Sequence, residues 1–351
     1  MSDAQPSVSA RNTAKPPEHL LRQIGLRYVS VSDLTIRRRR RRAGFIFVNG
    51  NGRTLRDDRI LYRLKRLAVP PAYEDVLYAA DPHAHLQAVG RDAAGRAQYR
   101  YHPDWEKVRE LRKARRLARL AEALPKIRTW VSRHIGAREP SRERAIAALI
   151  ELVALTALRP GSESYAKQHG TRGAATLLKS DLRIVGDRVS LRFIGKGSKP
   201  IEKDIRSARL ALALRRLAAL PGPRMFQYRN QDGAVLALRR REVNIALREI
   251  TGRAVSLKDF RTLAACANAL EHLAEMEPKP SQRGRKRQLL ATMREVAAEL
   301  ANTPAVCRKS YVHAAVVEAF ESGALKRIAR GRRTAASRER LLIKVLARVS
   351  L

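Results

Sequence analysis

SRERAIAALIELVALTAL, the run from Ser141 to Leu158, sets the fold class of this 351-residue chain. Its apolar residues recur at intervals of three and four, which is the period of an α-helix with a buried face. Ser141 is suited to begin that helix, because its hydroxyl can accept a hydrogen bond from the first helical turn. The run therefore predicts a long, apolar helix within a mainly helical domain.

The helical period extends to both sides of this run. It begins near Asp104, where Trp105–Ala123 is amphipathic and rich in basic residues, and it resumes beyond Ser207. A stretch rich in Pro, Gly and basic residues, Glu277–Arg287, interrupts it and is predicted to be an exposed linker. Leu325–Leu351 is predicted to be a basic helical tail without a role that the sequence reveals.

One β element intrudes into the helical region between Thr176 and Ile205. Val189, Leu191 and Phe193 alternate with polar residues, which is typical of a half-buried strand. The glycine-rich run Gly195–Pro200 then reverses the chain, and apolar residues resume after it. These features predict a β-hairpin with a lysine, Lys196, at its tip.

The amino-terminal part has a different pattern, with short apolar runs between turn residues. Gly44–Val48 is a candidate strand, and Asn49–Gly52 after it is a hairpin signal because Asn and Gly tolerate positive φ. Val76–Ala80 and Ala97–Tyr101 are further candidate strands. We therefore expect an α+β fold: a disordered leader (1–18), a small β-rich domain (19–103), a larger, mainly α-helical domain with the β-hairpin (104–323) and a basic tail (324–351).

The composition restricts the class of partner. Seventy-two Lys and Arg against 33 Asp and Glu give a formal net charge of +39, while 44% of the residues are hydrophobic. So much apolar sequence excludes a fully disordered basic tail. Such a charge favours either nucleic acid or an anionic membrane surface, and its spread along the whole chain favours nucleic acid. No segment is long and apolar enough to cross a bilayer or to act as a signal peptide, so we expect a cytoplasmic, nucleoid-associated protein.

Metal and disulfide chemistry are not expected. The two cysteines, Cys266 and Cys307, form no CxxC pair, which suits a reducing compartment. His83 and His85 lie close together, but no Cys or carboxylate cluster completes a zinc site. We interpret both histidines as surface or turn residues, and we predict no metal and no cofactor.

Four short motifs in the helical region carry candidate chemistry. They place Arg159 after the long helix, Lys196 at the hairpin tip, Lys258 with Arg261 in a Lys-x-x-Arg pair, and a final run, Asn302–Tyr311. Phosphoryl transfer to a tyrosine needs this set. A phenol with an ordinary pKa near 10 needs cations beside it to ionise. Guanidinium groups can hold the two non-bridging oxygens of the transition state, and a positioned acid can protonate the departing sugar oxygen.

The motifs resemble those of type IB DNA topoisomerases of the small bacterial and poxvirus kind. The resemblance rests on Asn302–Tyr311 and Lys258–Thr262, and it continues through the amino-terminal part, where the matching runs are Gly25–Ser30, Pro70–Tyr73, His85–Ala88 and Gly90–Pro103. It covers about His19 to Gly323 in one order. It implies a clamp of two lobes around duplex DNA and a nicking-closing reaction that needs neither ATP nor metal. We expect the protein to act as a monomer.

The resemblance also implies a role for each residue. Tyr311 attacks the scissile phosphate and forms a 3′-phosphotyrosyl link, and Lys196 is the general acid. Arg159 and Arg261 hold the non-bridging oxygens, and Asn302 donates a hydrogen bond to one of them. Lys258 assists. In the amino-terminal domain, the residues at family positions that contact DNA are Gln98, Tyr99, Arg100 and Tyr101.

Other interpretations remain at this point. A tyrosine recombinase shares the Arg–Lys–Arg–Tyr logic, although that class generally carries His-x-x-Arg where this chain has Lys258-x-x-Arg261. A DNA-compacting protein without catalysis would also explain the charge, and Tyr311 alone could be a packing residue.

The family more often has a β-branched residue after the first arginine, whereas Pro160 here pushes Arg159 away from helical backbone angles. The run Arg37–Arg42 could contact phosphate or be solvated.

Overall fold

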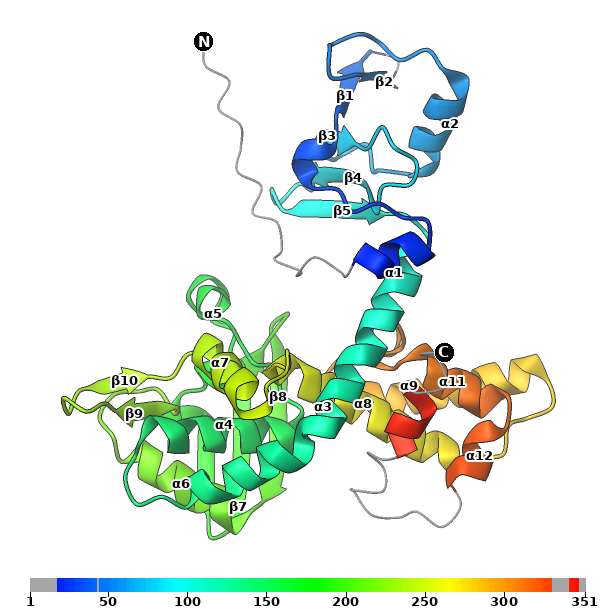
Figure 1. Cartoon of the computed structure of the whole chain (residues 1–351). Helices are drawn as coiled ribbons and strands as arrows, with labels where there is room; N and C mark the ends of the chain where they lie inside the picture. The colour runs from blue at the N-terminus through cyan, green and yellow to red at the C-terminus, as the bar shows by residue number, and fades with distance from the viewer. Residues whose placement is uncertain (1–17, 43, 330–340, 347–351) are drawn as a thin grey trace. The chain divides into compact units, whose positions relative to one another are not determined.

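A computed structural model of the chain describes residues 18–42, 44–329 and 341–346. The chain divides into two compact units, Met1–Arg112 and Lys113–Leu351. One long helix, α3 (Trp105–Ile135), continues through the boundary between them (Figure 1). The predicted leader, 1–18, lies outside the described residues except for Glu18. Helices and antiparallel sheets are both present, so the fold is α+β.

The amino-terminal unit contains a five-stranded antiparallel sheet. Its strand order is β2-β1-β3-β4-β5, and its apolar face packs around Phe47, Val76 and Tyr78. The helices are α1 (Glu18–Gln23) and α2 (Asp58–Arg66). The strands are β1 (Ile36–Arg41), β2 (Gly44–Val48), β3 (Glu74–Tyr78), β4 (Leu86–Arg91) and β5 (Ala97–Tyr101).

The predicted strand Gly44–Val48 forms, but its main partner precedes it. β2 pairs along its whole length with β1, so most of the arginine run lies in a strand. The Asn49–Gly52 turn also forms, with Asn49 Oδ1 accepting from two backbone N–H groups, yet only a single bridge, between Val48 and Thr54, follows it. The signal therefore identified a turn correctly and its strand pairing incorrectly.

Two polar side chains in this unit are structural. Arg38 donates to the carbonyl oxygens of Val69, Pro70 and Tyr73 and lies over the Phe45 ring, so this arginine of the run is neither solvated nor free for phosphate. His85 is only 5% exposed, and its Nδ1 accepts from the Val29 N–H. Burial lowers the pKa of His85 to about 4. His83 is exposed in a turn, as expected, whereas His85 lies in the following bend and is not a surface residue, because the Tyr28 and Trp105 rings lie against it.

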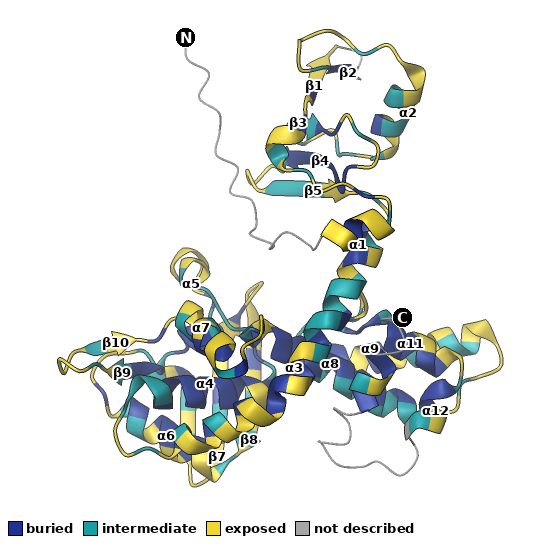
Figure 2. Cartoon of the chain, in the orientation of Figure 1, coloured by how far each residue is buried: buried dark blue, intermediate teal, exposed yellow. Residues whose placement is uncertain are grey.

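The carboxyl-terminal unit is built around the helix predicted first. α4 (Arg142–Thr156) is capped by Ser141, whose hydroxyl accepts from the Arg144 N–H, as expected. Most of α4 is buried (Figure 2), because α6, α7 and α8 pack against it. The helices around it are α5 (Glu163–His169), α6 (Ala208–Ala218), α7 (Arg240–Thr251), α8 (Leu257–Ala274), α9 (Gln282–Glu299), α11 (Ala314–Glu321) and α12 (Ala324–Ala329).

The predicted hairpin belongs to a three-stranded antiparallel sheet of order β6-β7-β8. Its strands are β6 (Leu182–Val185), β7 (Arg188–Gly195) and β8 (Lys199–Arg206). Val189, Leu191 and Phe193 face the core, as their alternation predicted. A second, two-stranded sheet joins β9 (Gln227–Arg229) and β10 (Val235–Ala237).

The predicted exposed linker and the predicted basic tail both contribute helical structure to this unit. The second half of the predicted linker is helical, because α9 begins at Gln282 after the Ser281 cap. In the basic tail, residues 341–346 are helical, and Leu341, Leu342, Val345 and Leu346 are buried in the core of the unit. No helix in the described ranges is long and apolar enough to cross a membrane.

Candidate active site

Tyr311 ends a short π-helix (Cys307–Tyr311). The segment begins at the Thr303 cap, with Pro304 in the first helical position, and the Val312 N–H then bonds to the Cys307 carbonyl at 2.9 Å. A π-turn is wider than an α-turn and often occurs at functional sites. The phenol is half-buried, and its segment packs against α8 and α9.

Arg261, on α8, joins the ends of two other helices beneath this phenol. Its guanidinium donates to the Ala157 carbonyl at the end of α4, at 2.6 Å, and to the Leu300 carbonyl at the end of α9. The guanidinium carbon lies 5.2 Å from the centre of the Tyr311 ring. Arg261 is 3% exposed, so its charge acts in a weakly screened environment.

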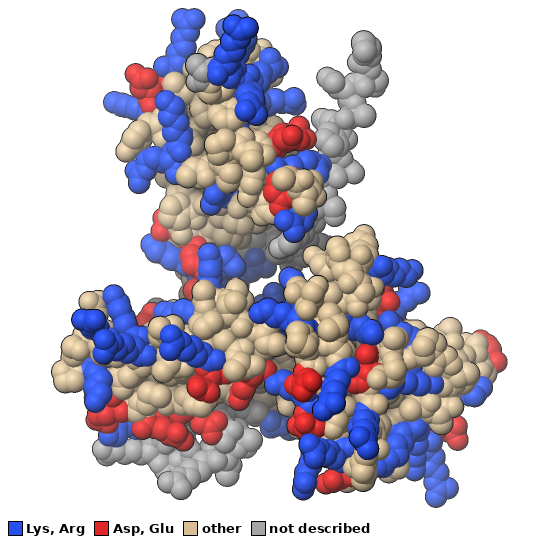
Figure 3. All heavy atoms as spheres, turned by 180° about the vertical axis from the view of Figure 1, so that it is seen from behind, with Lys and Arg blue, Asp and Glu red and all other residues tan. Residues whose placement is uncertain are grey.

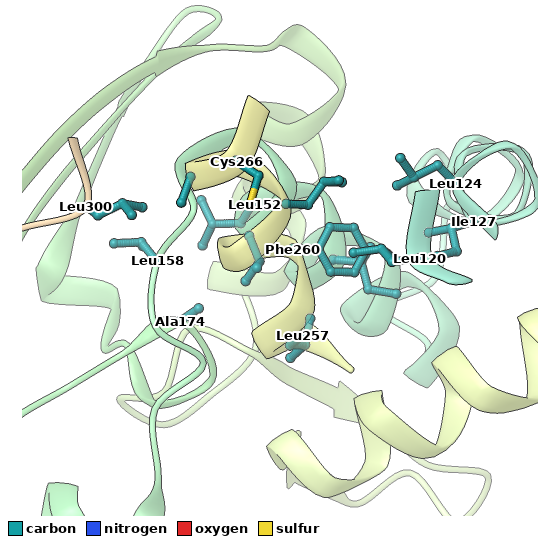
Figure 4. Packing of buried hydrophobic residues seen from close by; sticks show 14 of the residues in the cluster. Leu120, Leu124, Ile127, Leu152, Leu158, Ala174, Leu257, Phe260, Cys266 and Leu300 are labelled. Carbon is teal, nitrogen blue, oxygen red and sulfur yellow. The ribbon is translucent and has the colours of Figure 1, made fainter. Parts of the chain in front are cut away.

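Arg159 and Asn302 meet at this point from the ends of α4 and α9. Arg159 Nη2 donates to Asn302 Oδ1. Leu158 and Leu300, just before these two segments, lie side by side in the core (Figure 4). The backbone packing therefore brings together two site residues that are far apart in the sequence.

The loop after Arg159 is held by close backbone packing. α4 ends at Ala157, whose φ is 51°, and the Arg159 carbonyl accepts from the Ala174 N–H at 2.8 Å. A Cβ on Gly173 would lie 2.6 Å from the Gly161 backbone, so only glycine fits there. Arg159 is non-helical, as Pro160 predicted.

Lys196 lies in the tight turn between β7 and β8. Gly197 and Ser198 in that turn have φ of 76° and 55°, which explains the glycine-rich sequence. Lys196, Arg159 and Arg261 all line one cavity. Its other lining residues are Thr156, Leu158, Arg172, Gly173, Phe193, Gly195, Ile201, Lys203, Glu299, Leu300 and Ala301.

Sequence reasoning missed Lys203. It lies on β8 between the inward-facing residues Ile201 and Ile205, and its ammonium donates to the Glu299 carbonyl at 2.6 Å. Burial lowers its pKa, Glu299 opposes that shift, and the nearby Arg261 charge adds to it. A lysine at an inward position of an alternating strand was the available signal.

Lys258 stands apart from the other predicted cations. It is exposed in the first turn of α8 and is not among the residues that line the cavity. Its assisting role stays a prediction, and Lys203 is the lysine that the fold places beside Lys196.

The charges around Tyr311 favour its ionised form. Burial alone would raise the pKa of Tyr311, but the nearby positive charges, above all that of Arg261 and then that of Arg159, help to outweigh burial and hold that pKa below its ordinary value. Burial raises the pKa of the neighbouring Cys307 thiol instead, so this cysteine stays neutral. The site therefore distinguishes the phenol from the thiol one helical turn away.

Two buried donors at this site have no acceptor in the described part of the chain. They are Arg261 Nε and Asn302 Nδ2. A buried donor without a partner costs free energy, so such groups are rare unless a ligand completes them. Donors beside cations and a phenol of lowered pKa are suited to an anionic oxygen.

The four predicted DNA-contact residues lie together on β5. Tyr99 and Tyr101 share a face, with ring centres 6.2 Å apart, and Tyr101 is 42% exposed. Gln98 donates to the Asp92 carboxylate at 2.9 Å, and Arg100 donates to the Ala68 carbonyl at 3.0 Å. Their binding of DNA stays a prediction.

Charge is abundant over the surface of each unit. Figure 3 shows Lys and Arg side chains spread across the visible face, with fewer Asp and Glu. No group of three His, Cys, Asp or Glu side chains that could hold a metal ion occurs in the described ranges.

Comparisons with known proteins give a consistent result. Residues 102–336 match the family described as eukaryotic DNA topoisomerase I, catalytic core, and residues 44–92 match the bacterial DNA topoisomerase IB, N-terminal domain. DNA topoisomerase 1B of Acanthamoeba polyphaga mimivirus is 29% identical over 285 residues, which are 79% of this chain and 84% of that protein. DNA topoisomerase 1B of Vaccinia virus (strain Copenhagen) is 22% identical over 272 residues, 75% of this chain and 82% of that protein.

A distant match to a solved structure adds no further conclusion. The XerH site-specific recombinase bound to difH substrate is 15% identical, with a TM-score of 0.35 over 58% of this chain and 52% of that chain.

Proposed function

We propose that this chain, which belongs to the type IB DNA topoisomerase family and is a DNA topoisomerase, relaxes supercoiled duplex DNA through a covalent intermediate at Tyr311. The observation that carries the proposal is the pair of unpartnered donors, Arg261 Nε and Asn302 Nδ2, beside a phenol of lowered pKa. A scissile phosphate would supply the missing acceptor oxygens.

The proposed reaction is a reversible transesterification. The Tyr311 oxygen attacks the phosphorus, the bond to the 5′-oxygen breaks, and a 3′-phosphotyrosyl link forms. Lys196 gives its proton to the departing 5′-oxygen, because an unprotonated sugar oxygen is a poor leaving group. Arg159 and Arg261 stabilise the charge on the non-bridging oxygens, and Asn302 donates a hydrogen bond there.

Religation reverses these steps. The phosphotyrosine keeps the energy of the broken phosphodiester, so the reaction requires no nucleotide, and protein cations take the electrostatic role that a metal has elsewhere. The cut strand swivels about its partner before religation, which releases torsional strain. We also propose that the two units clamp around duplex DNA. The protein would act as a monomer in the nucleoid.

Relaxation of supercoiled plasmid in EDTA tests this function. We expect a ladder of topoisomers with wild-type protein and none with Tyr311→Phe. Strand exchange between sites would instead indicate a recombinase, and a mobility shift without a change of topology would indicate a DNA-compacting protein. Either result would refute the proposal.

A further inference from the structure

We propose that Lys113 and Arg116, on α3, are positioning residues that hold Tyr311 and Arg261 in their reactive arrangement. The inference rests on the proposed function, because it concerns the same site. Neither residue lines the cavity, but each contacts a segment that carries one of the two reactive groups. They therefore act through other residues and not on the DNA.

Arg116 anchors the first turn of α8. Its guanidinium lies 3.1 Å from Asp259 Oδ1 and 3.3 Å from Oδ2. Asp259 is 5% exposed and accepts from the Ser256 N–H at 2.9 Å and from the Ser256 hydroxyl at 2.8 Å. A buried carboxylate is costly without a cation, so Arg116 keeps this turn in place. Arg261 follows in the next residues of the same helix.

Lys113 anchors the other segment. Its ammonium lies 3.5 Å from the carbonyl oxygens of both Lys309 and Val312. These carbonyls flank Tyr311 at the end of the π-helix, where the last carbonyl groups of a helix lack partners within it. A cation at that end also complements the helix dipole. Lys113 is thus suited to fix the position of the nucleophile.

α3 offers a firm base for both contacts. Leu120, Leu124 and Ile127 continue the same helical face as Arg116 and belong to the core cluster that includes Phe260 of α8, with Leu120 next to the Phe260 ring (Figure 4). The polar contacts at one end of this face and the apolar packing along it therefore come from one helix, α3. The segments that carry Tyr311 and Arg261 are both held by that helix. Small displacements matter here, because an error of about 1 Å can cost on the order of 100-fold in rate.

Single-turnover formation of the covalent adduct tests the proposal, with DNA affinity measured in parallel. Arg116→Met and Lys113→Met should each slow adduct formation roughly 10- to 100-fold, within the cost of such a displacement. DNA affinity should stay within about 2-fold of that of Arg119→Met, the matched control. Arg119 is exposed on the same helix, so its replacement removes the same charge without the contact.

Further variants separate positioning from a general loss of stability. Arg116→Lys should recover part of the rate, and a substrate with sulfur at the 5′-bridging position should not rescue Arg116→Met, because no proton transfer is impaired. Asp259→Asn, nearly isosteric, should slow the reaction without adding to the effect of Arg116→Met, since both changes break one contact.

The outcomes distinguish this inference from the proposed function. Absence of adduct with wild-type protein would refute the function itself. Normal adduct formation by wild type, with rates of Arg116→Met and Lys113→Met equal to that of Arg119→Met, would overturn only the positioning roles. A loss of DNA affinity at unchanged rate would also overturn them.

Discussion

The predicted DNA-contact strand and the candidate active site differ in whether their side-chain N–H donors already have hydrogen-bond acceptors. On β5, Gln98 and Arg100 already donate to acceptors within their own unit. At the candidate active site, Arg261 Nε and Asn302 Nδ2 are buried without an acceptor. Gln98 and Arg100 are thus already paired, although the buried Tyr99 hydroxyl beside them has no partner among the described residues, whereas the active-site donors lack an acceptor that a bound phosphate could provide.

This difference shows which substitutions should be costly for catalysis. A donor that is buried and unpartnered gains its acceptor only when substrate binds, so its removal is felt during the reaction. A donor that already has an acceptor must exchange one hydrogen bond for another, and the net gain on binding DNA is small. We therefore expect large effects at the candidate active site and small effects at Gln98 and Arg100.

The largest effect should follow Tyr311→Phe. The change removes one oxygen and leaves the ring that packs over Arg261, so folding and DNA affinity should survive. Denaturant added after incubation with DNA should trap a covalent adduct for wild type and none for the variant. A persisting adduct would mean that another nucleophile acts, with the exposed Tyr165 the first to test.

Lys196→Ala should slow cleavage of ordinary DNA by something on the order of 10²- to 10⁴-fold, the size of general acid catalysis. Sulfur at the 5′-bridging position makes a leaving group that needs no proton. Cleavage of that substrate by Lys196→Ala should approach the wild-type rate, while Arg159→Ala and Arg261→Ala should recover much less, because they lose charge stabilisation.

Failure of the sulfur substrate to rescue Lys196→Ala would make Lys196 a phosphate contact and leave the acid elsewhere. Lys203 would then be tested before Lys258, because Lys203 lines the cavity and Lys258 does not. Lys203→Met combined with the sulfur substrate makes that distinction.

Asn302→Ala should reduce the cleavage rate by about 10²-fold, the size expected for one transition-state donor. Asn302→His should lose much less, because an imidazole N–H can donate a similar bond. Cleavage rates of the three proteins on one oligonucleotide give the measurement. Equal rates for the alanine variant and wild type would leave Asn302 as a partner of Arg159 alone. Its unpartnered amide would then have no role in the reaction, and the active-site side of the comparison would rest on Arg261 Nε.

Much of this arrangement could be predicted from local sequence. The Ser141 cap, the β7 alternation and the turn that holds Lys196 each follow from short-range rules. The amino-terminal turn after Val48 was also correct, although its strand partner was not, because pairing depends on distant residues. A local pattern predicts which residues form a strand or a turn, whereas the strands that pair with it depend on the whole fold.

The contacts that complete the site could not be predicted in this way. The meeting of Arg159 with Asn302, and the position of Lys203, depend on how α4, α9 and β8 pack. Burial of His85 likewise depends on tertiary contacts, and the apolar run that buries Leu341, Leu342, Val345 and Leu346 lies within a tail whose basic composition suggested a separate segment. The sequence suggested which residue types take part, and packing determined their partners.

The smallest effects should follow substitution of Gln98 and Arg100. Asp92 keeps its charge, since hydrogen bonds from Arg96, with Gln98 contributing, lower its pKa to about 2. That carboxylate therefore competes with DNA for the Gln98 amide, and the Ala68 carbonyl competes for the Arg100 guanidinium. Gln98→Ala and Arg100→Ala should each weaken duplex affinity less than about 3-fold, within the net worth of one exchanged hydrogen bond. Fluorescence anisotropy at fixed salt measures this, because phosphate binding varies steeply with salt. A loss of 10-fold or more for Gln98→Ala, with an unchanged Tm, would mean that the amide leaves Asp92 to bind DNA, and the contrast between strand and active site would fail.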